Sequence, residues 1–164
     1  VLHPNSRFAA DPAVSENDRS LVLLGCCEGL SFLLPGDAQS RAVRRLSRDY
    51  GDRLMADVLV MPHHGRYHAG LDEFVGHVRP AVALVSGREE DCHPRTQEVL
   101  RERGVPLWIT EREGAIIVTL RQGKALVTGH ASGRTMEFYP SGTSDDLRMT
   151  LTAGESEDAS TARR

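Results

Sequence analysis

The stretch that decides the fold is ADVLVMPHHGRYHAG, residues 56–70. Its first half is a nearly unbroken apolar run, which is typical of a strand buried on both faces of a parallel sheet. Pro62, His63, His64 and Gly65 follow at once. Because proline and glycine interrupt regular structure, these histidines are predicted to lie in the loop directly after the strand. In open α/β sheets, functional side chains gather at such strand ends.

The flanking sequence alternates between strand-like and helix-like patterns. After an extended lead-in over 1–19, apolar runs predict strands at 20–26, 30–36, 57–61, 81–86, 106–110 and 114–120. Apolar residues at helical spacing predict helices at 37–51, 71–78 and 94–104. The first two strands flank a glycine turn and should form a hairpin, covered on both faces. A second hairpin is predicted at KALVTGHA and RTMEFYP. This alternation indicates an α/β layered domain.

Length and composition indicate one globular domain. The chain has 164 residues, of which 40% are hydrophobic and 26% charged, and its formal net charge is -3. This balance argues against nucleic-acid binding by bulk positive charge, but not against a nucleic-acid substrate handled at a metal site. We assign the domain to 1–140. The remainder, 141–164, is polar and rich in small residues, so we expect a mostly disordered tail.

Targeting signals and cysteine motifs are absent from the sequence. No apolar run approaches the roughly 20 residues that span a bilayer. The start lacks both an initiator Met and the features of a signal peptide, so we expect this chain to be part of a longer protein. The three cysteines form no C-x-x-C pair, which argues against a zinc knuckle or a disulfide framework. We expect Cys26 and Cys27 to be buried thiols.

Three loops that follow predicted strands carry polar groups suited to chemistry. Asp37 is the last residue of LLPGD, and His63 and His64 lie in MPHHG, after the strand at 57–61. The third loop, SGREEDCHP, carries Asp91 and His93. Carboxylate oxygens and imidazole nitrogens are common ligands of divalent transition metals. Water bound to such a metal can act as a hydrolytic nucleophile.

Each of these residues also has a purely structural interpretation. Asp37 could cap the helix that follows it, because Asp is a favoured N-cap. His63 and His64 could be turn residues with satisfied hydrogen bonds, and His93 could bond locally beside Pro94. The remaining histidines have weaker claims, as surface or helix-face residues (His68, His77) or without supporting context (His3, His130). Types and spacing alone leave these alternatives open.

The order of the loops resembles the metallo-β-lactamase-like domain at the C-terminal end of ComEC-type DNA internalisation proteins. In that family one buried strand ends in T-G-D, a second in P-H-H-G-S, and a third leads through a polar loop to H-P. The matching segments here are LHP (2–4), ENDRSLVL (16–23), FLLPGD (32–37), ADVLVMPHHG (56–65), RPAVALVSG (79–87), HPRTQEVLRERGVPLWIT (93–110) and EGAIIV (113–118).

The resemblance implies the C-terminal half of a four-layered αβ/βα metallohydrolase sandwich. It implies a zinc or manganese site built from Asp37, which is also placed among the catalytic residues, and an imidazole of the His63–His64 pair, with His64 favoured. His93 would contact a phosphate or act as an acid, and Ser86 would join it in binding substrate. The remaining metal ligands would come from an H-x-H-x-D-H loop before Val1. Asn17 and Ser20 also match, without an assigned chemical role.

Several positions depart from the family pattern within the pocket itself. Arg66 replaces the serine after H-H-G, Pro35 replaces the threonine of T-G-D, and EEDCHP replaces the usual approach to H-P. Arg66 could instead supply a cation for a substrate phosphate, since guanidinium matches phosphate oxygens.

The resulting functional hypothesis is a metal-dependent hydrolase domain, phosphodiesterase- or nuclease-like, of a bacterial membrane DNA-uptake protein. DNA would be its substrate, an upstream transmembrane channel domain of the same polypeptide its partner, and the extracytoplasmic face its location, with no dedicated protein partner. Two alternatives remain open. One is a metal-free module that gates the channel or guides DNA, and the other is a freestanding metallohydrolase acting on another phosphoester.

Overall fold

Five of the six predicted apolar strands pair into one sheet in the order β1-β2-β3-β4-β5, and the sixth lies in a second sheet. A computed structural model describes residues 1–141 of the chain. The first two strands form the predicted antiparallel hairpin, and β2 to β5 run parallel. The bounds are β1 Leu23–Cys27, β2 Leu30–Leu34, β3 Val58–Val60, β4 Val82–Val85 and β5 Leu107–Ile109.

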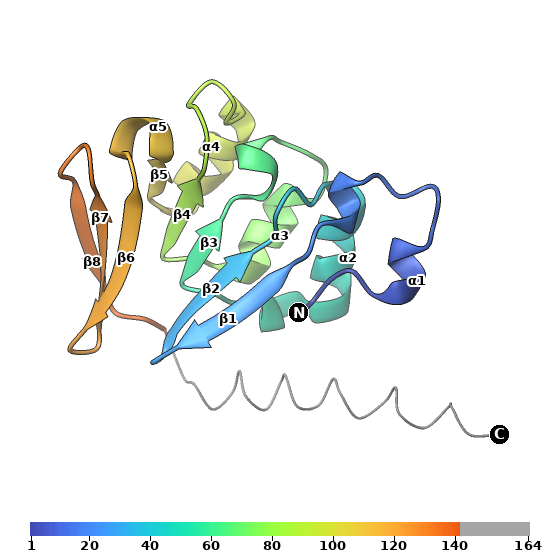
Figure 1. Ribbon diagram of the computed structural model, residues 1–164, viewed down its shortest axis with the longest axis horizontal. Coiled ribbons are helices and arrows are strands. Elements are labelled where there is room, and N and C mark those ends of the chain that lie inside the picture. The colour runs from blue at the N-terminus through green and yellow to red at the C-terminus, as the bar shows by residue number, and fades with distance from the viewer. Residues whose placement is uncertain (142–164) are drawn as a thin grey trace.

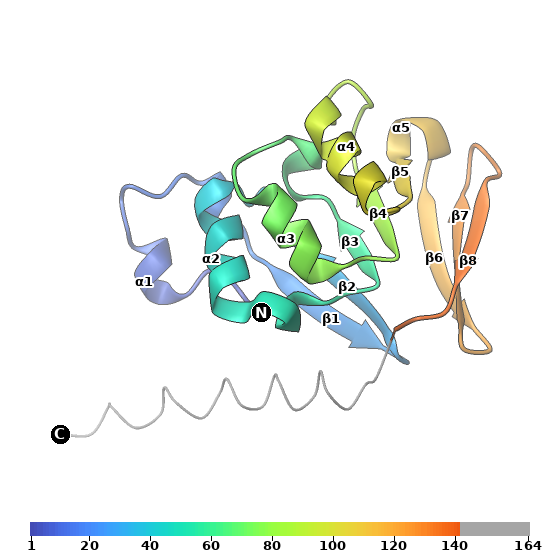
Figure 2. The same ribbon diagram turned by 180° about the vertical axis from the view of Figure 1, so that it is seen from behind.

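The three predicted helices cover one face of this sheet (Figures 1 and 2). They are α2 Ser40–Tyr50, α3 Leu71–Val78 and α4 Pro94–Glu102, and each connects two neighbouring parallel strands, as crossover connections do. Apolar residues on the inner side of α2, such as Val43 and Leu46, are buried against the sheet. Gly51 ends α2, as the sequence predicted, before the 3-10 turn η2 Gly51–Leu54.

A separate three-stranded sheet lies against the opposite face. The helix α5 Thr110–Glu113 leads from β5 into this sheet, which consists of β6 Ile116–Arg121, β7 Lys124–Gly129 and β8 Thr135–Phe138. The predicted second hairpin is confirmed as β7 and β8, and β6 completes the sheet. Between the sheets Trp108 is fully buried with Val58, Val82 and Val127. The Arg134 guanidinium covers the Trp108 ring at 4.1 Å.

The expectation that the first hairpin is covered on both faces is wrong. Phe32 and Leu34 are only half-buried, because the three-stranded sheet stops short of the hairpin side of the large sheet. A groove of about 370 Å³ remains there. Its lining is mainly apolar and consists of Cys27, Glu28, Leu30, Phe32, Leu34, Val58, Val60, Leu84, Val118 and Leu120.

Two further expectations are corrected. Cys26 and Cys27 are exposed rather than buried, because β1 is an edge strand and they lie at its end. The lead-in is not extended throughout, since it contains the helix α1 Ser6–Ala9 and the 3-10 turn η1 Asn17–Arg19. The predicted tail lies outside the described residues apart from Ser141. Within residues 1–141, no helix is long and apolar enough to cross a bilayer.

Asp57, just before β3, ties the end of the described chain to the large sheet. Its side chain is buried, and its Oδ2 accepts hydrogen bonds from the Ser31 amide (2.8 Å) and hydroxyl (2.6 Å). The other oxygen, Oδ1, accepts from the Ser141 amide (2.7 Å) and hydroxyl (2.6 Å). Because Ser141 follows β8, one carboxylate joins both layers.

The hydrogen bonds on Asp57 predict a loss of stability in acid. Burial alone would raise the pKa of Asp57, but the bonds from Ser141 and Ser31 outweigh it and lower the pKa. Such a group stabilises the fold fully above its unfolded pKa of about 3.9, and this contribution is lost as the pH falls through the lower folded pKa. We expect the free energy of unfolding, measured with urea, to decrease below about pH 5.

Asp57→Asn is the matched test. It should be less stable at neutral pH by roughly 1–3 kcal/mol. The asparagine NH₂ group would replace one carboxylate oxygen, so the amide and hydroxyl donors that face this oxygen would lose their acceptor. The stability of the variant should also depend less on pH below about pH 5. Identical pH profiles for the two proteins would contradict the role given to Asp57.

Candidate functional site

The loops that carry the candidate residues leave one edge of the large sheet. Strands β2, β3 and β4 are parallel neighbours, so their carboxyl ends lie side by side. Pro35 and Gly36 lead from β2 to Asp37, the 3-10 turn η3 Pro62–Gly65 follows β3, and Ser86 follows β4. This placement agrees with the sequence prediction for all three loops.

Asp37 and His64 are brought together, as predicted. The His64 Nε2 lies 3.6 Å from the Asp37 Oδ1, and both side chains are about half-exposed, at 51% and 46%. The Asp37 amide donates to the Ser20 hydroxyl oxygen at 3.0 Å. Ser20 therefore holds the turn that presents the carboxylate, a role that the sequence did not reveal.

Asp37 does not cap the helix that follows it. The free amides at the start of α2, those of Gln39 and Ala42, both donate to the Oδ1 of Asp18 at 3.0 Å. Asp18 is buried in η1, and the Ser15 hydroxyl donates to its other oxygen at 3.1 Å. The capping interpretation is wrong because a carboxylate distant in sequence takes that position. The Asp37 side chain is consequently left facing His64.

One hydrogen bond fixes the proton position on the His64 ring. Its Nδ1 lies 2.6 Å from the Ser86 carbonyl oxygen. A carbonyl oxygen can only accept, so Nδ1 carries the proton, and in the neutral ring Nε2 presents its lone pair toward Asp37. Metal-binding histidines commonly have this arrangement, with the second nitrogen bonded to a backbone carbonyl. A cation between Nε2 and the carboxylate would stabilise both.

His63 has the opposite ring arrangement. The Gln39 side-chain amide donates to its Nδ1 at 2.9 Å, which leaves the proton on Nε2. Its backbone amide donates to the Gly36 carbonyl at 3.0 Å and so links the β2 and β3 loops. Both histidines therefore lie in a turn, as their structural interpretation requires, and each ring has one nitrogen hydrogen-bonded. With its proton on Nε2, the His63 ring has no free lone pair at that nitrogen.

Both histidines occupy the left-handed region of backbone space. Their φ angles are 48° for His63 and 57° for His64. A residue other than glycine in this region costs roughly 1–3 kcal/mol, and such strain concentrates at functional sites. This backbone conformation places two adjacent imidazoles just beyond the end of a buried strand.

Gly65 permits the tight packing beneath these histidines. Its φ is 81°, and a Cβ at this position would lie 2.8 Å from the Cys92 sulfur. Burial raises the pKa of the Cys92 thiol to about 11, so this cysteine is a neutral packing group. The Gly65 carbonyl accepts from the His93 amide at 3.1 Å, which joins the second and third loops.

His93 is the N-cap of α4, so the local interpretation is confirmed. Its Nδ1 accepts from the Arg95 amide at 3.0 Å, and the Tyr67 ring lies 5.6 Å away between centroids. The Nε2 atom of His93 carries no hydrogen bond within the described chain. The hydrogen bond from the His93 amide to the Gly65 carbonyl places this residue beside the loop of His63 and His64. Arg66 is exposed in that loop, and Ser86 contributes its backbone carbonyl.

The other histidines lie in several environments. His77 is on α3 and contacts Asp52 at 3.0 Å, as expected for a helix-face residue. His68 is partly buried, and neither ring nitrogen has a hydrogen-bond partner among residues 1–141. His3, which had no sequence context, is buried and bonds the Asp18 carbonyl through Nε2 at 2.8 Å. It supports the segment that caps α2.

The arrangement of the candidate ligands can be compared with the one that a metal ion requires. No group of three or more His, Cys, Asp or Glu side chains within residues 1–141 is arranged to hold a metal ion. Asp37 and His64 converge, with His63 adjacent to them. Structural zinc sites use four protein ligands and catalytic ones three.

Comparisons with known proteins relate the chain to competence proteins. It is 30% identical to ComE operon protein 3 of Bacillus subtilis (strain 168) over 119 residues, which is 70% of this chain and 15% of that protein. It is 29% identical to Competence protein ComA of Neisseria gonorrhoeae over 126 residues, 74% of this chain and 18% of that protein. The predicted resemblance to ComEC-type competence proteins is confirmed.

The chain therefore spans less than one fifth of the length of these ComEC-type relatives. No family model and no solved structure matches it.

The contact between Gly65 and Cys92 can be tested by substitution. Gly65→Ala should destabilise the chain by roughly 1–2 kcal/mol from the left-handed backbone, and by about 1–3 kcal/mol more from overpacking against Cys92. Gly29→Ala is the matched control, because Gly29 also has a positive φ (88°) but no atom within 4 Å of its Cβ position. Urea unfolding of both variants measures the difference, and equal losses would contradict the packing described.

Proposed function

We propose that this chain is part of a metal-dependent phosphodiester hydrolase, nuclease-like, within a ComEC-type DNA-uptake protein. Asp37 and His64 would be its contribution to a zinc or manganese site. The observation that carries the proposal is the orientation of the His64 ring. Its Nδ1 donates a hydrogen bond to the Ser86 carbonyl oxygen, and its Nε2 lies 3.6 Å from the Asp37 carboxylate.

The ligand-holding side of the site is organised by neighbouring residues. Ser86 orients His64 through its carbonyl, and Ser20 positions the turn that carries Asp37. Asp18 anchors the start of α2 directly behind that turn. A divalent ion held here would supply Lewis-acid activation of water. His63, as the second imidazole, would be an additional ligand or would donate its Nε2 proton to a substrate oxygen.

The phosphate-binding side would be formed by the two loops that meet at Gly65. His93 keeps its Nε2 available because capping uses only Nδ1. Its ring can therefore contact a phosphate oxygen or act as an acid. Arg66 follows the histidine pair, and its exposed guanidinium would pair with a second phosphate oxygen.

The incomplete ligand set supports the proposal that further ligands come from a segment outside this chain. The long ComEC-type relatives are consistent with a larger polypeptide. In that proposal the chain is one half of a metallo-β-lactamase-like αβ/βα sandwich. The open groove beside Leu34, Val60 and Leu120 would then pack against the other half. DNA would be the substrate, and a membrane channel would belong to the same polypeptide, with this domain on its extracytoplasmic side.

A metal-free module that guides DNA at a channel is the second candidate. The departures from the family pattern in the pocket loops favour it, since Arg66 stands where the family has a serine after H-H-G. The two candidates differ in what they predict for metal binding, so metal titration separates them.

The chain by itself should bind zinc or manganese weakly. Two or three ligands fall short of the number that protein zinc sites use. Isothermal titration should show weak binding that His64→Ala abolishes. Tight binding by the 164-residue chain alone, with every ligand drawn from it, would overturn the proposal of a missing half.

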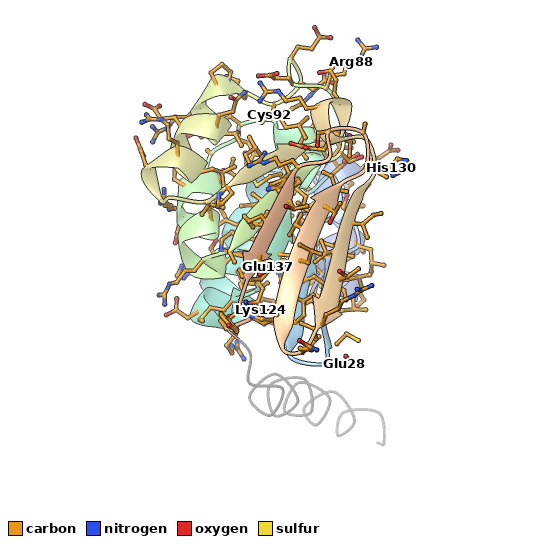
Figure 3. The ribbon with its side chains drawn as sticks, turned by 90° about the vertical axis from the view of Figure 1, so that its left-hand side faces the viewer. Glu28, Arg88, Cys92, Lys124, His130 and Glu137 are labelled. Atoms are coloured by element: carbon orange, nitrogen blue, oxygen red, sulfur yellow. The ribbon has the colours of Figure 1, made fainter. Side chains whose placement is uncertain are left out.

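In a longer natural form that includes the preceding sequence, substitution of the ligands should remove both metal and activity. Asp37→Ala and His64→Ala should each lower metal-dependent phosphodiester hydrolysis by at least about 100-fold, and elemental analysis should show reduced metal content. His130→Ala is the matched control, because this exposed imidazole lies on the three-stranded sheet just after β7 (Figure 3). Absence of both metal and hydrolysis in the unmodified longer form would favour the metal-free module, whereas unchanged metal content and activity in the two ligand variants would contradict the roles given to Asp37 and His64.

The same assay tests the cation role of Arg66. If Arg66→Ala leaves phosphodiester turnover unchanged, the guanidinium does not contact the substrate phosphate.

A further inference from the structure

The outer side of α2 concentrates positive charge on a chain that is negative overall. Four arginines, Arg41, Arg44, Arg45 and Arg48, lie within this helix. They line a shallow depression of about 450 Å³ together with Phe8 and Asp11. We call these four residues the arginine stripe.

Helical periodicity produces the stripe. Positions 41, 44, 45 and 48 follow the i, i+3, i+4, i+7 pattern that lies along one side of a helix. The residues between them, including Ala42, Val43 and Leu46, are buried against the sheet. At about 1.5 Å per residue, the stripe extends over roughly 10 Å.

Neighbouring carboxylates neutralise only part of this charge. Arg41 lies 3.6 Å from Asp11, while Arg45 and Arg48 share Asp49 at 3.1 and 2.8 Å. Four guanidinium groups face two carboxylates, which leaves an excess of two positive charges in the stripe. The formal charge of the whole chain is -3. Like charges at helical spacing oppose each other, so the stripe is not explained by helix stability.

The arginine stripe is continuous with the candidate site. The N-cap of α2 is Gln39, whose side chain bonds His63. Gly70, at the end of the loop that carries Arg66, lies against the stem of Arg44, because a Cβ there would be 2.7 Å from the Arg44 Cγ. In Figure 2, α2 borders the helix layer on the side of α1, and the loop into α3 runs over its beginning. Positive charge therefore extends from the candidate site along the helix.

We propose that the arginine stripe binds the phosphodiester backbone of a nucleic acid strand. Guanidinium groups form charge-assisted, bidentate contacts with phosphate oxygens. At roughly 10 Å, the stripe is long enough to contact successive phosphates of one strand. None of the four arginines belongs to the proposed metal site, and binding to the stripe requires neither metal nor hydrolysis.

The stripe favours backbone contacts over base recognition. Phe8 is its aromatic residue, and the Arg45 guanidinium covers that ring at 5.2 Å. The His3 ring packs against Phe8 at 4.5 Å in an edge arrangement. The ring is therefore engaged within the chain, the stripe offers mainly guanidinium groups, and binding should be independent of sequence.

An anionic membrane surface fits the stripe less well. Helices that bind in the plane of a membrane insert an apolar face between the lipids. The apolar face of α2 is already buried against the sheet, so the helix offers only its charges. Vesicle binding is accordingly an outcome that the experiment must exclude.

The test is a fluorescence anisotropy titration of a labelled oligothymidylate with the 164-residue chain, without divalent metal and at several salt concentrations. Arg44→Gln/Arg48→Gln removes two charges and keeps part of each side-chain stem. Arg101→Gln/Arg121→Gln is the matched control, because it removes two exposed arginines from α4 and β6. Circular dichroism verifies that each variant is folded, and Arg48→Gln alone replaces the double variant if it is not.

The expected result is a shallower salt dependence in the stripe variant. Loss of two phosphate contacts should reduce the slope of log K against log salt by about 1.4, equivalent to about 25-fold weaker binding at about 0.1 M if the affinities converge near 1 M. The control should bind as the unmodified chain does, and oligoadenylate should bind as oligothymidylate does.

Three results would overturn the proposal: unchanged binding in the stripe variant, an equal loss in the control, or binding only to phosphatidylcholine–phosphatidylserine vesicles. Since the titration contains no divalent metal, a failure of the proposed hydrolase leaves its outcome unaffected.

Discussion

The parallel register of β2, β3 and β4 is the constraint on which the site depends. One row of hydrogen-bonded neighbours runs across the sheet through Leu33, Leu59 and Ala83, all fully buried. Counting four residues onward from each member gives Asp37, His63 and Gly87. A slip of one residue in β3 would exchange its two faces, and it would separate the imidazoles from the carboxylate. Burial of this row therefore fixes the distance between groups that lie beyond it.

Much of the fold follows from local patterns in the sequence. Helix α3 begins and ends at the residues predicted from its apolar spacing, and α4 begins at the predicted proline but ends at Glu102, two residues before Gly104. The exposure of Cys26 could not be predicted in this way, because it depends on β1 being an edge strand. The half-burial of Leu34 depends in turn on how far a second sheet extends. Both are properties of the assembled layers rather than of any segment.

The candidate site likewise combines features that the local sequence predicts with features that only the assembled fold determines. The proximity of Asp37 and His64 was predictable, because parallel strands bring their ends to one edge of a sheet. The capping of α2 by Asp18 was not, since the partners are more than 20 residues apart. Local pattern favoured Asp37 as the cap, and only the fold reveals a buried carboxylate closer to the helix amides. The opposite ring arrangements of the two histidines likewise depend on long-range hydrogen bonds.

The left-handed backbone at His63 and His64 limits which side chains these two positions accept. Glycine, asparagine, aspartate and histidine enter that conformation most readily, whereas branched side chains are nearly excluded from it. Valine or isoleucine at either position would therefore disturb the turn itself, while asparagine would remove the imidazole and let the backbone keep its path. The shape of the turn and the chemistry of its side chains are thus separable properties.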